Sequence, residues 1–261
     1  MKPPTPVSDR TQIIQFGRLT SPETEQRKKT LLILPVGALE QHGDGLPLST
    51  DTLRADYVAE AVAQRLAGRA HVLPSLPYGV SPHHASFSGT VSLPARLFID
   101  VVSSIVRTLA DSGWDRILVV SGHGGNGASL GVVEQDLLAT HPDLHFAWTP
   151  VSALATTTTS QLPRAEISGH SGESETAQVL AIDPSAVDRD SLSSGVRTLK
   201  DMNPKARLSR RKPPSISVRF EQYASNGVLG DPTSVTAEQG QEILDEIVAR
   251  LTDYAESLLR L

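Results

Sequence analysis

Three residues of metal-binding type lie close together near the start of this chain: Glu40, His42 and Asp51. Glu40 and His42 are two positions apart, so in an extended segment both side chains project to the same side and could reach one cation. Asp51 follows a turn containing glycine and proline that could fold it back onto them. Isolated pairs of this kind are common by chance, and the alternative is that all three are ordinary loop residues. The interpretation therefore depends on the rest of the chain.

Two further clusters offer the same kinds of ligand. His123 lies between glycines in SGHGGNG, directly after an apolar run. Glycines let the backbone approach closely, although glycine-rich loops after strands also bind phosphate. His170, Glu173 and Glu175 lie in GHSGESET, at the expected start of a helix, where the helix dipole favours carboxylates. Glu173 and Glu175 are about 200° apart on an ideal helix, so at most one is expected to face a shared site.

The elements that must position these residues alternate between strands and helices. Apolar runs predict strands at 31–36, 71–79, 116–121 and 145–149. Helical periodicity predicts helices at 52–66, 95–109, 127–140, from about 172, and at 236–259. This alternation predicts an α/β fold with a mostly parallel sheet covered by helices on both faces. Ligands bind at the carboxyl ends of such strands, where Glu40 and His123 both lie.

Local signals predict some details of these elements. Thr50 or Asp51 is expected to cap the helix at 52–66, and Asn126 is expected to cap the helix at 127–140. The threonine-rich segment 156–166 is expected to be a loop. We divide the chain into an N-terminal extension, residues 1–30, and a single domain, residues 31–261.

Composition narrows the classes of function. The net charge of −5 gives no positive field to attract nucleic acid or an anionic membrane. The absence of cysteine excludes disulfides, thiolate ligands and a cysteine nucleophile, so a metal site must use histidine and carboxylates. The basic run at 200–214 lacks interleaved aromatic residues and favours a solvated or subunit-contacting loop. No signal peptide or membrane span is evident, and a cytoplasmic, soluble protein is expected.

Taken in order, the motifs are far more specific than any one of them. The chain resembles the creatininase (creatinine amidohydrolase) family, and its GHGGN sequence is similar to the formamide deformylase and mycofactocin-peptidase branches. The resemblance rests on PVGALEQHGDGLPLSTD (35–51), GVSPHHASFSGTVSL (79–93), SGHGGNG (121–127), GHSGESET (169–176) and GVLGDPTSVTAEQG (227–240).

This resemblance implies a metallohydrolase with two divalent metal ions per chain on a three-layer α/β/α sandwich, often assembled as a homohexamer. Zinc is the first choice, with Mn²⁺ or Fe²⁺ as alternatives. By position, Glu40, Asp51 and His123 would hold one metal ion, and His42 and Asp51 the other. Two metals sharing Asp51 would give a hydroxide near neutral pH and polarise the scissile carbonyl.

The histidine motif departs from that of creatininase, which has Tyr, Glu and Asn where this chain has Gly124, Gly125 and Asn126. The second metal then needs another carboxylate. Glu175 is the first candidate, and Glu173 is kept as a reserve ligand or catalytic residue. The missing tyrosine argues against creatinine as the substrate.

The remaining roles are also implied by the resemblance. His170 would carry a proton to the leaving nitrogen. His84 would line the pocket or make a structural hydrogen bond, and Ser81, Gly124 and Trp148 are further candidates for substrate binding.

The primary hypothesis is hydrolysis of a linear or cyclic amide of a small molecule. The alternatives are cleavage of a short peptide precursor, ring opening of a cyclic carbonyl compound, and a metal-binding scaffold without catalysis.

Overall fold

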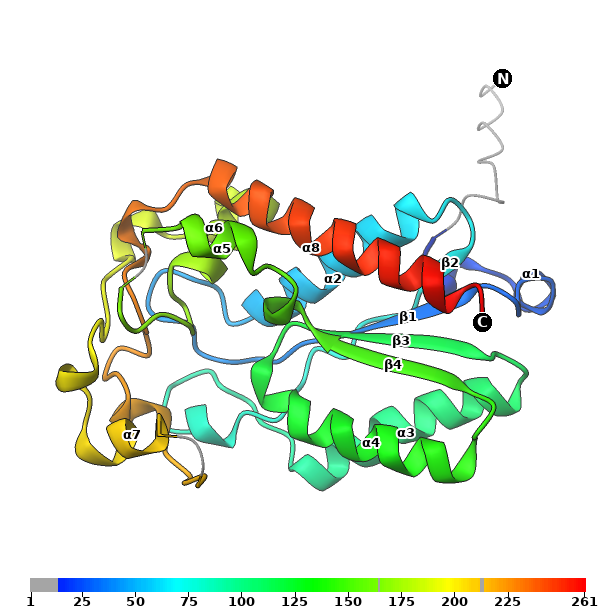
Figure 1. Cartoon of the computed structure of the whole chain (residues 1–261), viewed down its shortest axis with the longest axis horizontal. Helices are drawn as coiled ribbons and strands as arrows, with labels where there is room; N and C mark the ends of the chain where they lie inside the picture. The colour runs from blue at the N-terminus through cyan, green and yellow to red at the C-terminus, as the bar shows by residue number, and fades with distance from the viewer. Residues whose placement is uncertain (1–13, 164, 212–213) are drawn as a thin grey trace, which may run out of the picture.

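The computed structural model describes residues 14–163, 165–211 and 214–261, and its centre is a parallel sheet (Figure 1). The strands are β1 (Leu31–Val36), β2 (Ala70–Val72), β3 (Arg116–Ser121) and β4 (His145–Pro150). Their order across the sheet is β2-β1-β3-β4, and every neighbouring pair is parallel. Parallel neighbours need crossover connections, which the helices between them supply.

Helices cover both faces of the sheet (Figure 1). One face carries α2 (Thr50–Arg65), α6 (Glu173–Ile182) and α8 (Ala237–Leu258), and α5 (Thr157–Gln161) packs beside α8. The other face carries α3 (Ala95–Asp111) and α4 (Gly127–Thr140). The short helices α1 (Ser21–Glu25) and α7 (Pro204–Ser209) lie at opposite ends of the molecule. The predicted α/β sandwich with a parallel sheet is therefore confirmed.

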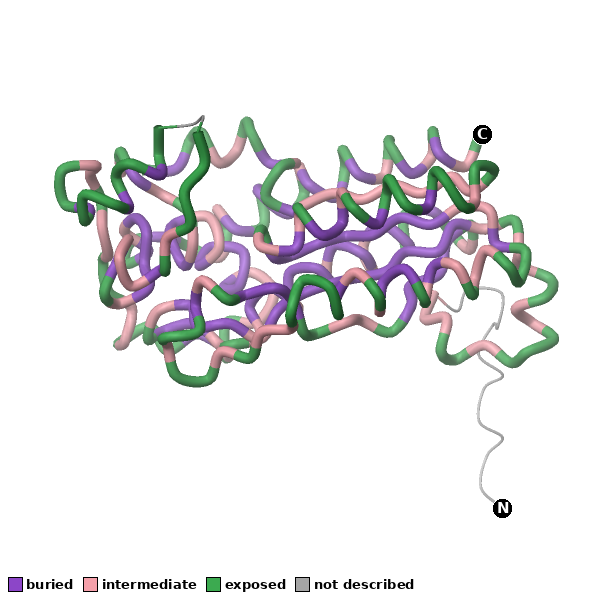
Figure 2. Tube along the Cα trace, turned by 90° about the horizontal axis from the view of Figure 1, so that it is seen from below, coloured by how far each residue is buried: buried purple, intermediate pink, exposed green. Residues whose placement is uncertain are grey.

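Burial along β1 shows why this strand is central. All six of its residues are buried, and in Figure 2 the sheet runs as a buried layer between the helices. Leu31 and Ile33 join the core beneath α2 and α8, whereas Leu32 and Leu34 join the core beneath α3 and α4. Successive side chains of a strand point to opposite faces, so a run of apolar residues suits a strand covered on both sides.

A third, smaller core lies at the carboxyl end of the sheet. It contains Ile167, Met202, Ala206, Phe220, Ala224 and Leu229. These residues pack together, and all of them except Ile167, which precedes α6, lie between α6 and α8. Between those helices the described residues form α7 and several short 3-10 helices.

Three sequence expectations differ from the structure. The strand expected at 71–79 is only three residues long, because Pro74 and Pro77 cannot donate to a sheet ladder. The segment expected to be a loop contains α5. Ser49, not Thr50 or Asp51, occupies the N-cap position of α2, so both predicted caps lie inside the first turn.

Asn126 does occupy the N-cap position of α4, but its side chain makes no cap hydrogen bond. Instead Oδ1 accepts from Val80 N at 2.9 Å, and Nδ2 donates to the carbonyl of Gly37 at 3.0 Å. Buried backbone groups in the loops beside the sheet need partners more than the helix end does. Asn126 therefore fixes two loops that lead into the candidate site.

Residues 14–30 of the expected extension contact the sheet edge. Val72 N donates to the carbonyl of Ile14, and the Phe16 ring packs edge-on against Trp114. Residues 1–13 lie outside the described part of the chain. Among the described helices, none is long and apolar enough to cross a membrane.

Candidate metal centre

The register of the sheet brings the two expected ligand loops together. β1 and β3 are neighbours, with Val36 paired to Ser121 at their carboxyl ends. The loop after β1 carries Glu40 and His42 and leads to Asp51 in the first turn of α2. His123 follows β3 by two residues, and all four ligand candidates are buried.

Asp51 lies between two imidazoles. Its Oδ1 is 3.4 Å from His42 Nε2, and its Oδ2 is 3.0 Å from His123 Nδ1. On its far side, His123 Nε2 is 3.5 Å from Glu40 Oε2. A carboxylate with one oxygen toward each of two histidines has the arrangement expected of a ligand shared by two metal ions.

The hydrogen bonds around His42 leave a lone pair facing carboxylates. His42 Nδ1 donates to the carbonyl of Glu40 at 2.9 Å, so in the neutral ring Nε2 is an acceptor. That nitrogen is buried without a hydrogen-bond partner in the described chain, as are both carboxylate oxygens of Glu40. Buried lone pairs that face one another are costly unless a proton or a cation lies between them. The site therefore fits a metal ion.

Charges within the cluster shift its pKa values. Burial by itself would lower the pKa of His42 and His123, but Asp51 beside both raises each to about 9. Burial would raise the pKa of Asp51, but the two histidines hold it well below its ordinary value. For Glu40 burial dominates and raises the pKa to about 7. Without a metal ion, the cluster therefore takes up protons that a cation would displace.

The two glutamates of α6 have separate roles. Glu175 Oε2 is 3.7 Å from His42 Nε2 and accepts from Ser171 N at 2.8 Å. Glu173 is fully buried and accepts from Ser168 Oγ, Ala165 N and Asp231 N. The reserve and catalytic roles proposed for Glu173 do not match this placement, because its oxygens hold loops together away from the cluster.

Arg54 is a member of the site that the sequence interpretation missed. It lies one turn after Asp51 on α2 and is only 1% exposed. Its Nη1 is 2.6 Å from Glu175 Oε1 and 3.9 Å from Asp51 Oδ1, and it also donates to the carbonyl of Gly122. The i,i+3 spacing from Asp51 was a readable signal, since residues three apart share a helix face.

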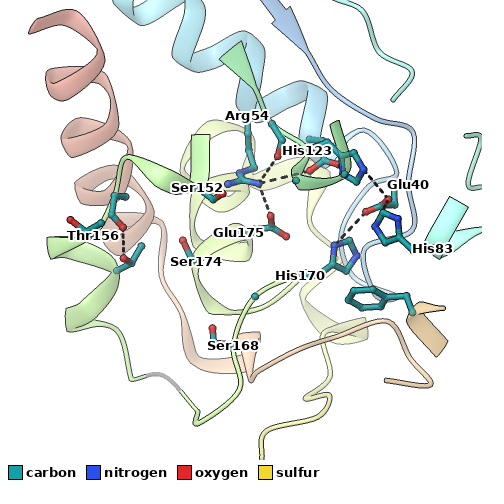
Figure 3. A pocket seen from close by; sticks show the side chains of 18 of the residues that line it. Glu40, Arg54, His83, His123, Ser152, Thr156, Ser168, His170, Ser174 and Glu175 are labelled. Carbon is teal, nitrogen blue, oxygen red and sulfur yellow. Dashed lines mark hydrogen bonds and ion pairs between the residues drawn. The ribbon is translucent and has the colours of Figure 1, made fainter. Parts of the chain in front are cut away.

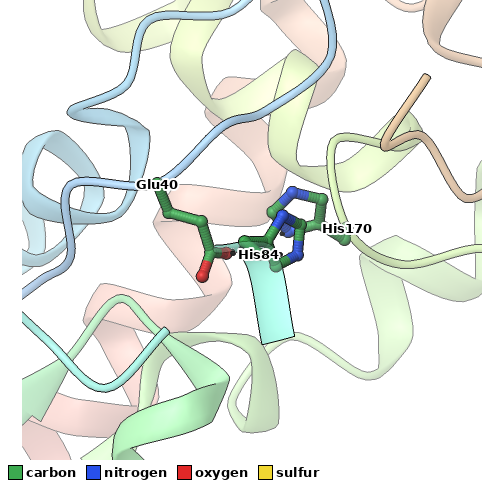
Figure 4. Close-up of side chains that lie close together, drawn as sticks. All are labelled: Glu40, His84 and His170. Atoms are coloured by element: carbon green, nitrogen blue, oxygen red, sulfur yellow. Dashed lines mark ion pairs between the residues drawn. The ribbon is translucent and has the colours of Figure 1, made fainter. Parts of the chain in front are cut away.

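His170 points at the cluster from the loop before α6. Its Nε2 is 2.7 Å from the carbonyl of Gln41, to which it donates, and its Nδ1 is 3.5 Å from Glu40 Oε1 (Figure 4). Burial, together with His42 and His84, holds the pKa of His170 well below its ordinary value. The ring is therefore neutral, with the Nδ1 lone pair facing Glu40.

His84 supports this ring and does not line the cavity. It is fully buried, stacks against Phe220 and packs 4.3 Å from the His170 ring, measured between centroids. Its Nε2 is 3.6 Å from Glu40 Oε1 (Figure 4). Burial and the neighbouring His83 lower its pKa to about 2. Neither role expected for His84 matches its position, because it lies outside the cavity lining and both ring nitrogens are buried without a hydrogen-bond partner among the described residues.

A cavity of about 750 Å³ opens onto the cluster (Figure 3). Its lining includes Glu40, Asp51, His123, His170 and Glu175, which are five of the predicted site residues. The resemblance assigned a role to His84 and none to its neighbour His83, yet His83 lines the cavity. Its Nε2 is 3.7 Å from Glu40 Oε2, and its ring stacks on His123.

Of the predicted substrate-binding residues, only Gly124 lines this cavity. Ser81 is buried, and its Oγ is 3.2 Å from His123 Nε2, so it positions that ring. Trp148 lies outside the lining, where its indole donates to Glu134 at 2.7 Å. Phe220 does line the cavity, and its place in an irregular segment gave no sequence signal.

The adjacent glycines 124 and 125 differ in the space that a side chain would have. A Cβ at Gly125 would lie 2.3 Å from both His123 Nε2 and the carbonyl of Val80, whereas nothing lies within 4 Å of a Cβ at Gly124. A glutamate at position 125 could not be accommodated without moving His123. Glycine at 124, in contrast, leaves the cavity open.

Known proteins resemble this chain along most of its length. The creatininase family profile, described as creatinine amidohydrolase, matches residues 17–255. The mycofactocin precursor peptide peptidase of Mycobacterium ulcerans is 34% identical over 243 residues, which cover 90% of this chain and 87% of that protein.

Solved structures share the fold. A Bacteroides fragilis protein superposes with a TM-score of 0.82 at 24% identity, covering 96% of this chain and 98% of the other. A creatininase structure named for Mn has a TM-score of 0.77 at 27% identity, covering 94% and 98%. A mutant creatininase of Zn-Zn type gives a TM-score of 0.78 at 27% identity and the same coverage.

Proposed function

This chain belongs to the creatininase family, and on that basis we propose that it is a metal-dependent amidohydrolase that uses two divalent metal ions. One observation carries the proposal: the ligand atoms of the buried residues Glu40, His42 and Asp51 lie within 4.8 Å of one another, and the half-buried Glu175 places Oε2 3.7 Å from His42 Nε2. Both carboxylate oxygens of Glu40 and Nε2 of His42 are buried without a hydrogen-bond partner among the described residues, and a cation would compensate them.

The ligands divide into two overlapping sets. Glu40, Asp51 and His123 would hold one ion, and His42, Asp51 and Glu175 the other. Both sets contain only histidine and carboxylate, which suits Zn²⁺ and Mn²⁺. The creatininase structures named for those metals support the same choice.

When bound, the ions would lower the pKa of a water molecule and polarise the scissile carbonyl. The protein supplies the proton path. His170 Nδ1 takes a proton as water adds to the carbonyl carbon, and returns it to the nitrogen as the C–N bond breaks. Its Nε2–H bond to the carbonyl of Gln41 keeps Nδ1 aimed at the reacting atoms. The products are a carboxylic acid and an amine.

A peptide substrate is favoured as a second candidate by two observations. The near full-length relative is named as a peptide peptidase, and Gly124 leaves a cavity of about 750 Å³ open. Small formamides and short peptides are therefore both to be tested. We further propose that the chain forms a homohexamer, which light scattering of the purified protein would check.

The experiment combines a metal count with hydrolysis. We expect close to two zinc or manganese atoms per chain, and release of amine from formamides or peptides that stops when a chelator removes the metal. Two bound metals without hydrolysis of any amide would contradict the catalytic proposal and favour a scaffold. Hydrolysis that persists in fully stripped protein would contradict metal dependence.

A further inference from the structure

The cavity has a second half that the proposed chemistry does not use. Its lining there is rich in hydroxyl side chains, and we call this region the hydroxyl half. In Figure 3, Arg54 and Glu175 lie between these hydroxyls and the cluster formed by Glu40, His83 and His170. The hydroxyl half comprises Ser152, Thr156, Thr159, Ser168 and Ser174.

Some of these hydroxyls are already engaged within the protein. Ser168 donates to Glu173, Thr159 donates to the carbonyl of Ala155, and Ser174 accepts from Gln178. Ser152 and Thr156 are exposed in the cavity, and their hydroxyls form no hydrogen bond with any residue that the structure describes. They are therefore available to a bound molecule.

Arg54 presents a strong donor at this boundary, and the exposed Arg210 is a second arginine in the lining of the cavity. Its Nε donates to Gln178 Oε1 at 3.1 Å, and its Nη1 donates to Glu175 and to the carbonyl of Gly122. Nη2 has no partner among the described residues, yet it is not one of the fully enclosed unpartnered atoms. Since Arg54 lines the cavity but is 99% buried, Nη2 is the part of its guanidinium that a ligand can reach.

We propose that the hydroxyl half binds a second oxygen group of the substrate, with Arg54 Nη2 as the principal donor and Ser152 and Thr156 beside it. This inference rests on the proposed amide hydrolysis. Guanidinium and hydroxyl donors suit a carboxylate or a carbonyl oxygen. The ion pair with Glu175 offsets the charge of Arg54, so a neutral carbonyl is accepted as well as an anion.

The substrate class follows from this arrangement. The scissile amide lies at the metal ligands while another oxygen function of the same molecule reaches past Glu175. N-acylated amino acids and peptides carry such a group, but a simple formamide does not. The hydroxyl half would therefore select for a substrate with an extended, oxygen-bearing arm.

Three formamides test this with the metal-loaded protein: N-formylglycine, N-formylglycinamide and N-methylformamide. They share the scissile bond and differ in whether the arm ends in a carboxylate, an amide carbonyl or a methyl group. We expect kcat/KM for the first two to exceed that for the third by roughly tenfold to a hundredfold, the range for hydrogen bonds to a charged donor. A ratio between the first two far from one identifies which oxygen group is preferred.

Variants locate the effect. The double substitution Ser152→Ala with Thr156→Val touches no metal-ligand candidate. It is expected to lower the preference for N-formylglycine and N-formylglycinamide by roughly threefold to tenfold for each neutral hydrogen bond lost. Ser160→Ala, which removes an exposed hydroxyl of α5 that donates to the carbonyl of Thr157, is the matched control. Arg54→Lys is expected to lower the preference further, with the metal count measured alongside.

The outcomes separate the two proposals. Equal kcat/KM for all three formamides would overturn the hydroxyl half as a binding region while leaving amide hydrolysis intact. An unchanged preference in the double variant and in Arg54→Lys would also overturn it. Hydrolysis of none of the formamides and of no short peptide would instead contradict the proposed function itself.

Discussion

The two halves of the cavity are built by different means. The ligand half takes its side chains from loops at the ends of adjacent strands and from the first turns of α2 and α6, and most of them are buried. The hydroxyl half takes Ser152 and Thr156 from exposed segments around the short helix α5. We infer that the sheet positions the residues proposed for the chemistry, while peripheral segments position those proposed to bind the substrate.

The largest effect is expected at the centre of the ligand half. Asp51→Ala removes the carboxylate between His42 and His123, so both metal ions should be lost and activity should fall by about 10³-fold or more. Elemental analysis and amide hydrolysis measure this directly. Asp100→Ala, an exposed carboxylate on α3, is the control and should keep both metals. Two bound metal ions in the Asp51→Ala variant would contradict the proposal that Asp51 bridges them.

The two α6 glutamates should respond differently. Glu175→Gln is expected to lower the metal count from two toward one, because a neutral amide is a weak ligand. Glu173→Gln should keep both metals but lower the free energy of unfolding by about 1–3 kcal/mol, since it disrupts buried hydrogen bonds to a charge. Metal analysis and denaturant unfolding distinguish them. The reverse pattern would exchange their roles.

The neighbouring glycines provide a finer test. Gly125→Ala places a methyl group against His123 Nε2, so metal affinity should fall by roughly tenfold to a hundredfold, as when a ligand is misplaced. Gly124→Ala meets open space and should leave the metal count unchanged. Gly124→Phe should narrow the cavity and slow hydrolysis of peptides more than that of formamides. Equal effects at 124 and 125 would contradict this contrast.

Metal binding should depend on pH, because the pKa of His42 and of His123 is raised to about 9 in the metal-free cluster. A metal ion needs the neutral rings, so loading below pH 9 must displace protons. Affinity should therefore rise as the pH increases from 6 to 9, with at least one proton released per ion. Calorimetry in buffers of different ionisation enthalpy measures the release. An affinity independent of pH would be inconsistent with the charged histidines.

The smallest effect concerns the support of the hydroxyl half. Glu246 of α8 accepts hydrogen bonds from Thr157 N, Thr158 N and Thr158 Oγ1 at the start of α5. Burial by itself would raise the pKa of Glu246, but the hydrogen bonds from Thr158 and Thr157 and the charge of Arg250 lower it to about 2. Its contribution to stability is present above pH 4.5 and is lost as the pH falls toward 2. Glu246→Gln should lower Tm by a few degrees at pH 7. In this variant Tm should also decrease less as the pH falls from 4.5 toward 2. If Tm of the variant and of the unmodified protein fell equally between pH 4.5 and pH 2, this role of Glu246 would be contradicted.

The sequence predicted the ligand half far better than the hydroxyl half. Strand periodicity placed Glu40 and His123 at one sheet edge. The family resemblance assigned the ligand roles of Glu40, His42, Asp51 and His123 and made Glu175 the candidate for the remaining ligand. Arg54 was missed although its spacing from Asp51 was readable. Trp148 was misplaced because its indole bonds to Glu134 outside the cavity.

The hydroxyl half could not be predicted in the same way. Ser152, Thr156 and Phe220 come from segments without periodicity, and their positions depend on tertiary contacts with α8 and the third core. Threonines at 156–159 were expected to form a loop, yet Glu246 accepts hydrogen bonds from the amides that begin α5. A glutamate almost ninety residues away is not visible to a local sequence pattern.

The position of Glu175 on α6 has a consequence for how the protein withstands proteases. Two residues earlier on the same helix, Glu173 ties the backbone of Ala165 and Asp231 together, and α6 packs along α8. A metal ion bound by Glu175 would thus stabilise α6, and with it the two loops that contain Ala165 and Asp231. Removing the metal should increase the rate at which trypsin cuts the described part of the basic run, residues 200–211, while cleavage near α3 and α4 stays slow. The metal would then protect the peripheral segments as well as activate the reaction.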